Sequence, residues 1–363
     1  MIKRRTVILL GAVTLATAAG AVAAVVDRTA ETRTEVEAVR LYPKLDDQAG
    51  EVQQVQVARA ADSPDGTVTL LRTDGGWVLK ERDHYPARTD LVRKLLFDLG
   101  QLELIERKTA DPTRFDRLEL ADVGGKGAKA SRVVVTTAGG DEVVDLHVGK
   151  RRESPTGGKP RVYVRRSDER QTYLAEGELD LRGGPVEWLL REIVNVPKDS
   201  IAEATITAPS GAVLHLSRVG KDFRIDDMPA GRKVASQYSV NNAATVLDKL
   251  LFDDVRSAAG LTFSADQGRA VFKTGDGLTV TLEFAADPKA AGPGAPEPEA
   301  PEPGAGPWIR VAIAVAADAG DDARKLAEAA SRQTEGWAYR VSSYDLERLR
   351  ATAESLTKPA EGS

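Results

Sequence analysis

The sequence predicts an α+β fold: two tandem, similar repeats of antiparallel sheet with one main helix each, after one N-terminal transmembrane helix. Three observations lead to this prediction. The chain of 363 residues begins with a basic cluster and a run of 21 uncharged residues. Short stretches of alternating apolar and polar residues, separated by glycine-rich turns, then recur as expected of antiparallel strands. The same order of hairpins and helices occurs twice, which indicates an internal repeat.

The N-terminal segment is predicted to cross a membrane. A short basic tail, residues 1–5, is expected in the cytoplasm, and residues 6–26 would span about 30 Å as a helix. Because basic residues stay on the cytoplasmic side, the chain after residue 26 is expected outside the cytoplasm. The alternative is a cleaved signal peptide, since Ala21-Val22-Ala23 resembles a cleavage site. A retained helix predicts a single-pass inner-membrane protein with its C-terminal domain in the periplasm.

The first repeat is predicted at residues 51–196, after a juxtamembrane segment at residues 27–50. Hairpin turns are expected at Asp74-Gly75-Gly76 and Ala138-Gly139-Gly140, each between two strand-like stretches. The main helix begins near Thr89 and ends at Gly100. Its apolar face is predicted to consist of Leu91, Val92, Leu95, Leu96 and Leu99. A second, short helix is expected from Pro185 to Ile193, because proline suits a first helical position.

The second repeat is predicted at residues 197–357, followed by a tail at residues 358–363. Its main helix is expected to begin near Val240 and to include Val246, Leu247, Leu250 and Leu251 on one face. A closing helix is predicted over Tyr344–Leu356. Residues 285–307 are rich in Pro, Ala, Gly and Glu, which predicts a disordered insertion within a hairpin.

Both main helices are predicted to contain the pentapeptide Lys-Leu-Leu-Phe-Asp, at residues 94–98 and 249–253. The pentapeptide occurs at the same place in the same order of elements, so we treat it as a mark of duplication. Phe97 and Phe252 are therefore expected to be equivalent core anchors. Asp98 and Asp253 are expected to be polar residues at helix ends rather than catalytic acids.

Composition excludes several classes of function. The net charge is −5, whereas a general nucleic-acid binder carries a basic excess. Cysteine is absent, which excludes disulfides, thiolate metal sites and a cysteine nucleophile. The three histidines lie far apart in sequence, so we expect no cofactor and no metal. Asp145 and His147 are expected on one strand face, either as metal ligands or, more simply, as a solvated face.

One charged feature is a candidate interaction surface. Basic residues gather on one predicted hairpin, at Lys150, Arg151, Arg152, Lys159, Arg161, Arg165 and Arg166. Alternation along a strand places Arg161 and Arg165 on one face, with Tyr163 between them. This surface is interpreted either as a contact for anionic lipid or an acidic partner, or as a solvated hairpin that protects a sheet edge from aggregation.

Several short motifs together resemble the DUF4340 family, over nearly the whole chain from Leu41 to Pro359. They are Leu41-Tyr42-Pro43, Asp74-Gly75-Gly76-Trp77, Tyr85-Pro86-Ala87, Glu106-Arg107-Lys108-Thr109, Val148-Gly149-Lys150, Tyr163-Val164-Arg165-Arg166 and Gly336-Trp337-Ala338-Tyr339. The resemblance implies a single-pass, envelope-facing bacterial protein of uncharacterised function, often associated with ABC transporters of the gliding-motility type. It supplies no catalytic residue.

Three functional hypotheses follow. The first is a non-enzymatic accessory protein, anchored in the membrane by its N-terminal helix and associated with ABC transporter subunits or another envelope complex. The second is a periplasmic module that binds a glycan or a lipid. The third is a hydrolase that uses carboxylates such as Asp253 or Asp254, which requires two carboxyl groups to converge in a pocket.

Overall fold

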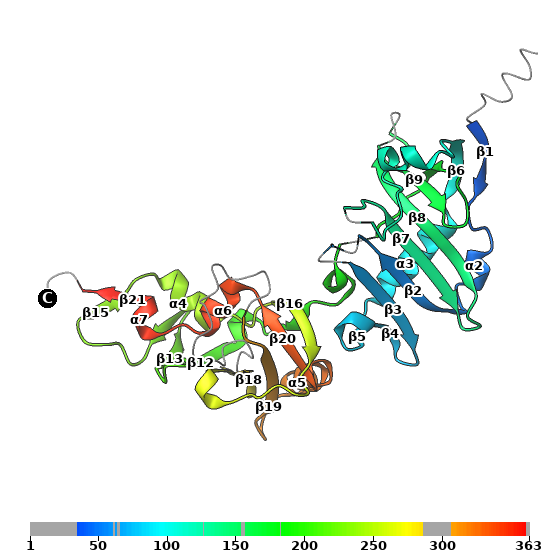
Figure 1. The fold of residues 1–363 in the computed structure, drawn as a ribbon. Helices are drawn as coiled ribbons and strands as arrows, with labels where there is room; N and C mark the ends of the chain where they lie inside the picture. The colour runs from blue at the N-terminus through cyan, green and yellow to red at the C-terminus, as the bar shows by residue number, and fades with distance from the viewer. Residues whose placement is uncertain are drawn as a thin grey trace, which may run out of the picture. The chain divides into compact units, whose positions relative to one another are not determined.

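The computed structural model describes residues 35–360, apart from 61, 64, 65, 126, 154–156, 182 and 286–305. The described chain divides into two compact units: unit 1 comprises residues 35–78 and 88–184, and unit 2 comprises Leu79–Ala87 and residues 185–360. Both units are mixed α and β with few helices, and each is built on one large antiparallel sheet (Figure 1). The predicted α+β class with antiparallel sheets is therefore confirmed.

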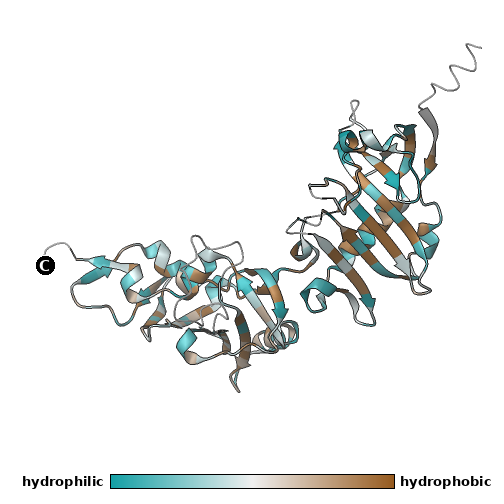
Figure 2. Cartoon of the chain, in the orientation of Figure 1, coloured by the Kyte–Doolittle hydropathy of each residue, from teal (hydrophilic) through white to brown (hydrophobic). Residues whose placement is uncertain are grey.

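Unit 1 contains most of a ten-stranded sheet with the order β1-β6-β10-β9-β8-β7-β2-β3-β4-β5. Its strands are β1 (Glu35–Arg40), β2 (Val52–Ala58), β3 (Thr67–Thr73), β4 (Gly76–Leu79), β5 (Tyr85–Pro86), β6 (Glu103–Arg107), β7 (Ser131–Thr137), β8 (Glu142–Arg152), β9 (Arg161–Arg166) and β10 (Tyr173–Glu176). Hydrophobic and hydrophilic residues alternate along the long strands, as the brown and teal bands in Figure 2 show. This alternation buries one set of side chains and exposes the other.

The helix α3 (Thr89–Gly100) supplies most of the helical core of unit 1. Its buried apolar residues are Leu91, Val92, Leu95, Leu96 and Leu99, as predicted. The short helix α2 (Leu45–Gln48) lies against α3 and buries Leu45. Phe97 is 61% exposed. At 100° per residue it lies far around the helix from the buried stripe, so it is not the core anchor that we predicted.

Unit 2 contains a nine-stranded sheet with the order β11-β16-β20-β19-β18-β17-β12-β13-β14 and a two-stranded sheet of β15 and β21. The strands are β11 (Glu192–Val194), β12 (Ile201–Thr207), β13 (Val213–Val219), β14 (Asp222–Ile225), β15 (Arg232–Val234), β16 (Leu250–Ser257), β17 (Arg269–Thr274), β18 (Leu278–Phe284), β19 (Ile309–Val315), β20 (Trp337–Val341) and β21 (Thr357–Pro359). The helices are α4 (Gln237–Ala244), α5 (Asp321–Thr334), α6 (Ser343–Leu349) and α7 (Ala353–Leu356).

The two large sheets have the same strand order. The order β1-β6-β10-β9-β8-β7-β2-β3-β4 in the first sheet corresponds, strand by strand, to β11-β16-β20-β19-β18-β17-β12-β13-β14 in the second. Each strand of the second series has a number ten higher than its counterpart. The chain order is also shared, since one helix precedes β6 (α3) and one precedes β16 (α4). The common order therefore extends over nine strands.

A segment from the first half of the chain belongs to unit 2. Leu79–Ala87 includes β5, and Tyr85 is buried among Phe252, Trp337 and Tyr339 at ring distances of 5.6, 4.8 and 6.3 Å. Arg82 pairs with Asp254 at 2.5 Å, and the Asp83 carboxylate accepts a hydrogen bond from the Ser257 amide at 2.8 Å. The phenol groups of Tyr85 and Tyr339 are both buried in this cluster. Because burial disfavours the charged phenolate, the pKa of each is raised.

The predicted main helix of the second repeat is shorter than expected. The helix α4 ends at Ala244, and Lys249 has a φ of +59°, which a continuing helix does not allow. Leu250 and Phe252 then point into the core from β16, while Leu251 is exposed. A short apolar run fits a helix or a strand equally well, and pairing with β11 and β20 decides for the strand.

Three other helices differ from prediction. The expected helix from Pro185 to Ile193 is a 3₁₀ turn over Pro185–Trp188 followed by β11. The closing helix is divided into α6 and α7, because Thr352 has an extended backbone and caps α7. The helix α5 was not predicted, because its buried face consists of small residues that give a weak hydrophobic signal: Ala323, Ala327, Ala330 and Thr334.

Several predicted segments lie outside the described residues. These are the N-terminal tail and helix at residues 1–26, part of the juxtamembrane segment, most of the insertion at 285–307, and residues 361–363. Within the residues that are described, no helix is both long and apolar enough to cross a membrane. The strands that flank the insertion pair directly, since Phe284 is opposite Ile309. The boundary between the two units lies between Gly184 and Pro185, whereas the predicted boundary between the repeats was at residue 197. The segment between these positions contains β11, which pairs with β16 of unit 2.

Candidate functional site

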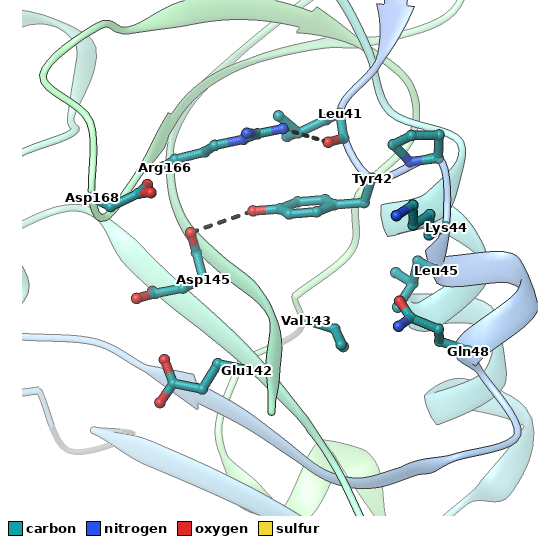
Figure 3. Close-up of a pocket in the computed structure, with 11 residues that line it drawn as sticks. Leu41, Tyr42, Lys44, Leu45, Gln48, Glu142, Val143, Asp145, Arg166 and Asp168 are labelled. Carbon is teal, nitrogen blue, oxygen red and sulfur yellow. Dashed lines mark hydrogen bonds between the residues drawn. The ribbon is translucent and has the colours of Figure 1, made fainter. Parts of the chain in front are cut away.

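A cleft of about 520 Å³ in unit 1 is the candidate site (Figure 3). One wall is the segment that follows β1, and the other is formed by β8 and the end of β9. The lining residues are Leu41, Tyr42, Pro43, Lys44, Leu45, Gln48, Glu142, Val143, Asp145, Arg166 and Asp168. The cleft thus combines an aromatic ring, apolar side chains and charges of both signs, which is typical of recognition sites.

The wall that follows β1 is firmly attached to unit 1. β1 pairs antiparallel with β6, and the Leu41 amide donates to the Leu102 carbonyl at 2.8 Å. Arg166 donates from Nη2 to the Leu41 carbonyl at 2.7 Å. Leu41 and Leu45 are buried beneath this wall. The segment that leaves the predicted membrane anchor is therefore part of the folded unit from β1 onward.

Tyr42 is the centre of the cleft. Its ring lies between the Arg166 side chain and Asp145 in Figure 3, with the guanidinium carbon of Arg166 5.5 Å from the ring centroid. Its hydroxyl donates to the Asp145 carbonyl at 3.3 Å. Burial raises the pKa of the Tyr42 phenol, so it remains protonated at neutral pH. Tyr42 therefore provides a neutral aromatic ring in a fixed position, with the Arg166 guanidinium over one of its faces.

Asp145 is held as a carboxylate. Arg132 donates to both of its oxygens at 2.7 Å, and the Ser167 hydroxyl donates to one of them at 2.5 Å. Hydrogen bonds from Arg132 lower the pKa of the Asp145 carboxyl, against the opposing effect of partial burial. A carboxylate so engaged is a poor general acid or base near pH 7.

His147 and Arg165 form a second, buried polar cluster in unit 1. They are opposite each other in the pairing of β8 with β9, and both are nearly inaccessible to solvent. Asp122 lies 2.5 Å from Arg165 Nη2 and 3.7 Å from His147 Nε2, while Arg165 lies over the Phe115 ring at 5.0 Å. Burial, with help from Arg165, lowers the pKa of His147 to about 4, so the imidazole is neutral. Its Nδ1 has no hydrogen-bond partner among the described residues.

The predicted basic hairpin is β8 and β9, but its basic residues do not form one exposed surface. Arg165 is buried, and Arg166 is bonded to the Leu41 carbonyl. Arg161 pairs with Glu176 at 3.4 Å in the neighbouring strand. These three residues are used inside the unit. Fewer cations of the hairpin are therefore available to contact a lipid or a partner than the sequence suggested.

The remaining basic residues are at the end of β8. Lys150 is exposed, Arg152 donates to the Tyr163 hydroxyl at 3.2 Å, and Arg151 donates to the Leu179 carbonyl. Lys159 is exposed in the connection to β9. Contact of this end with a lipid or a partner stays a prediction.

The structure keeps the other candidate residues apart. Asp145 pairs with Arg132, whereas His147 Nε2 lies 3.7 Å from the Asp122 carboxylate. Asp253 pairs with Arg191 at 2.7 Å, and Asp254 pairs with Arg82. In the described part of the chain, no group of three or more His, Asp or Glu side chains is arranged to hold a metal ion.

The family model for a domain of unknown function, DUF4340, matches residues 77–267, which is just over half of the chain. This chain belongs to the DUF4340 family. The resemblance stated from the motifs is thereby confirmed over this range, which is shorter than the Leu41–Pro359 range expected. Comparison with the curated proteins and with the solved structures gave no match.

Three of the short motifs singled out in the sequence have a clear structural role, two of them within the matched range and Gly336-Trp337-Ala338-Tyr339 beyond it. A Cβ atom on Gly149 would overlap the carbonyl oxygens of Leu118 and Glu119, so Val148-Gly149-Lys150 allows that turn to approach β8 closely. Tyr85-Pro86-Ala87 and Gly336-Trp337-Ala338-Tyr339 meet in the aromatic cluster of unit 2. These motifs identify the fold rather than a reaction.

Sequence analysis did not identify Tyr42 as the centre of a cleft. The available signal was Leu41-Tyr42-Pro43, in which a tyrosine follows directly on a predicted juxtamembrane segment. The partners of Tyr42 are more than a hundred residues away, at Asp145 and Arg166, and no local pattern links them. Only the pairing order of the sheet brings these strands beside the segment after β1.

Proposed function

We propose that this DUF4340 protein is a non-enzymatic accessory protein of the cell envelope. Residues 6–26 anchor it in the inner membrane, and both units lie on the periplasmic side. Unit 1 presents the Tyr42 cleft to a subunit of an ABC-type transporter or of another envelope complex. The anchor, the location and the partner are all parts of this proposal.

The observation that carries the proposal is the attachment of the post-anchor segment to unit 1. β1 begins at Glu35, so only residues 27–34 separate the predicted anchor from the sheet. Eight residues extend at most about 28 Å. A membrane subunit beside the anchor would therefore be within reach of unit 1, and the cleft is built on the same segment.

The chemistry of the cleft supports recognition rather than catalysis. Its central groups are bonded to one another: Tyr42 to Asp145, Asp145 to Arg132, and Arg166 to Leu41. Lys44 and Asp168 are exposed at the rim and provide charges of opposite sign for a partner. Charges at the rim of an interface help to orient two proteins as they first meet.

We infer in addition that the two units arose by duplication of one ancestral unit. The support is the common order of nine strands, with α3 and α4 before corresponding strands. The shared pentapeptide does not support it, because residues 94–98 are helical and residues 249–253 precede and enter a strand.

Site-specific photo-crosslinking in living cells tests the accessory role. A photoreactive amino acid replaces Lys44 at the rim of the cleft in the full-length chain. The control replaces Lys325, which is an exposed lysine on α5 of unit 2. We expect position 44 to give one discrete adduct with an integral membrane protein, and position 325 to lack that adduct.

Two results would contradict the proposal. One is the same set of abundant proteins captured from both positions. The other is no adduct from position 44 in a strain where the protein is present at its native level. A reporter fused after residue 30 checks the topology separately, because activity of a reporter that works only in the cytoplasm would overturn the predicted orientation.

A further inference from the structure

A second cavity, of about 620 Å³, lies entirely in unit 2 between α4 and the α6–α7 pair. It does not contribute to the proposed accessory role. Two of its residues are unusually exposed for aromatic side chains: Tyr238 on α4 is 72% exposed, and Tyr344 on α6 is 53% exposed. Aromatic rings usually bury most of their surface, so two exposed rings at one cavity need an explanation.

The two rings are held in place by polar contacts. Asn242 donates to the Tyr344 hydroxyl at 2.9 Å. Hydrogen bonds with Asn242 and Tyr344 lower the pKa of Tyr238. Arg348 lies over the Tyr344 ring at 5.3 Å and donates to the Asn242 carbonyl at 2.9 and 3.0 Å. The result is a preorganised platform of two rings with hydroxyl and amide groups at their edges.

Arg350 lines the same cavity and lacks a counter-charge. Its Nε is buried without a hydrogen-bond partner, and no carboxylate among the described residues forms an ion pair with it. The guanidinium carbon of Arg350 lies over the face of the Phe284 ring, 5.0 Å from its centroid. Burial lowers the pKa of Arg350, which reflects the cost of removing a cation from water. A carboxylate in the cavity would offset this cost through charge-assisted hydrogen bonds.

We propose that this cavity binds an acidic saccharide, with a sugar ring against Tyr238 and Tyr344 and a carboxylate of the ligand at Arg350. The C–H groups on the face of a sugar ring carry partial positive charge and complement the negative face of an aromatic ring. The ring hydroxyls match Asn242 and the tyrosine hydroxyls as donors and acceptors. The volume is in the range of sites that bind small ligands.

The alternative occupant, an acidic peptide, fits the cavity less well. The walls are the helices α4, α6 and α7 and the turns beside them. An extended peptide is commonly bound by adding a strand to a free sheet edge, and no strand of the described chain lines this cavity. The peptide is therefore an outcome that the experiment must distinguish.

Calorimetric titration of the purified full-length protein tests the proposal. The probes are digalacturonate, its neutral analogue digalactose, and tetraglutamate as the acidic peptide. We expect saturable binding of digalacturonate that is at least tenfold tighter than that of digalactose. Y238A should weaken digalacturonate binding at least tenfold, and R350Q should remove the preference for the acidic sugar.

A matched control and a folding check keep the result clear. F97A removes another exposed helical aromatic residue, in unit 1, and should leave binding unchanged. Because Arg350 is partly buried, R350Q is checked by its far-ultraviolet spectrum and melting temperature, and Y238A tests the cavity if R350Q does not fold. The proposal is overturned by absence of digalacturonate binding, by equal affinity in wild type and Y238A, or by preferential binding of tetraglutamate. The accessory role does not depend on these outcomes, since its test uses position 44 in unit 1.

Discussion

Unit 1 and unit 2 contain the same pentapeptide, Lys-Leu-Leu-Phe-Asp, in different secondary structures. Residues 94–98 lie within α3, where the two leucines are buried and Phe97 faces solvent. In residues 249–253, Lys249 has a left-handed backbone conformation and the other four residues begin β16, where Phe252 is fully buried. The same five residues therefore bury different side chains, because a helix and a strand repeat with different periods.

The comparison also shows where the likeness of the two units resides. The common order of nine strands does not depend on the pentapeptide, which is out of register between the units. The segment that precedes each main helix differs as well. In unit 2, β15 pairs with β21 near the C-terminus, whereas the segment before α3, which contains β5, is grouped with unit 2. Strand order is shared, and the connections around the helices differ.

The largest expected effect distinguishes the two phenylalanines. Phe252→Ala removes a fully buried ring that lies 5.5 Å from Tyr339 and should destabilise unit 2 by about 3–5 kcal/mol. Phe97→Ala, at an exposed position, should change the free energy of unfolding by about 0.5 kcal/mol or less. Urea unfolding of both variants measures this difference. Equal losses would mean that the two phenylalanines are equivalent after all.

A smaller effect tests the assignment of Leu79–Ala87 to unit 2. Tyr85→Ala should cost about 3 kcal/mol, because it empties the site between Phe252 and Trp337. Hydrogen exchange measured by mass spectrometry should show faster exchange in β16 and β20, with β7 and β8 unchanged. Tyr85→Phe keeps the ring and serves as the control. Loss of protection in β7 and β8 instead would place this segment in unit 1.

The smallest effect is a pH dependence that arises in unit 1. His147 has an ordinary pKa of 6.5 when unfolded and a pKa of about 4 when folded, so the unfolded chain binds more protons between these values. The contribution of His147 to stability is therefore present above pH 6.5 and is lost as the pH falls toward 4, by roughly 1.4 kcal/mol at pH 5.5 and at most about 3 kcal/mol. His147→Gln should reduce this slope in urea unfolding measured from pH 7 to 4.5. An unchanged slope would assign the pH dependence to other groups.

Much of the fold could be predicted because local patterns were strong. The turns at Asp74-Gly75-Gly76 and Ala138-Gly139-Gly140 were expected, and they lie between paired strands. The face of α3 was predicted residue by residue. The helix α5 was missed because alanines form its buried face, and the end of α4 was missed because Leu250 and Phe252 also fit a helix.

The candidate site was harder to predict than the fold. The sequence placed Arg161, Arg165 and Arg166 on one hairpin, which is correct, but it could not supply their partners. Glu176, Asp122 and the Leu41 carbonyl come from other strands and loops, and they convert a predicted charged surface into internal bonds. The exposed rings Tyr238 and Tyr344 likewise come from helices about a hundred residues apart.

The sequence by itself determined the antiparallel α+β class, the family, and the order of most strands and turns. These depend on alternation, glycine turns and short motifs, which are properties of neighbouring residues. Only the tertiary structure decided that residues 249–253 enter a strand, that Tyr85 belongs to unit 2, and that Arg165 is buried beside His147. The physical reason is that strand pairing and burial join residues far apart in the chain, and their free energies exceed the weak local preferences of short segments.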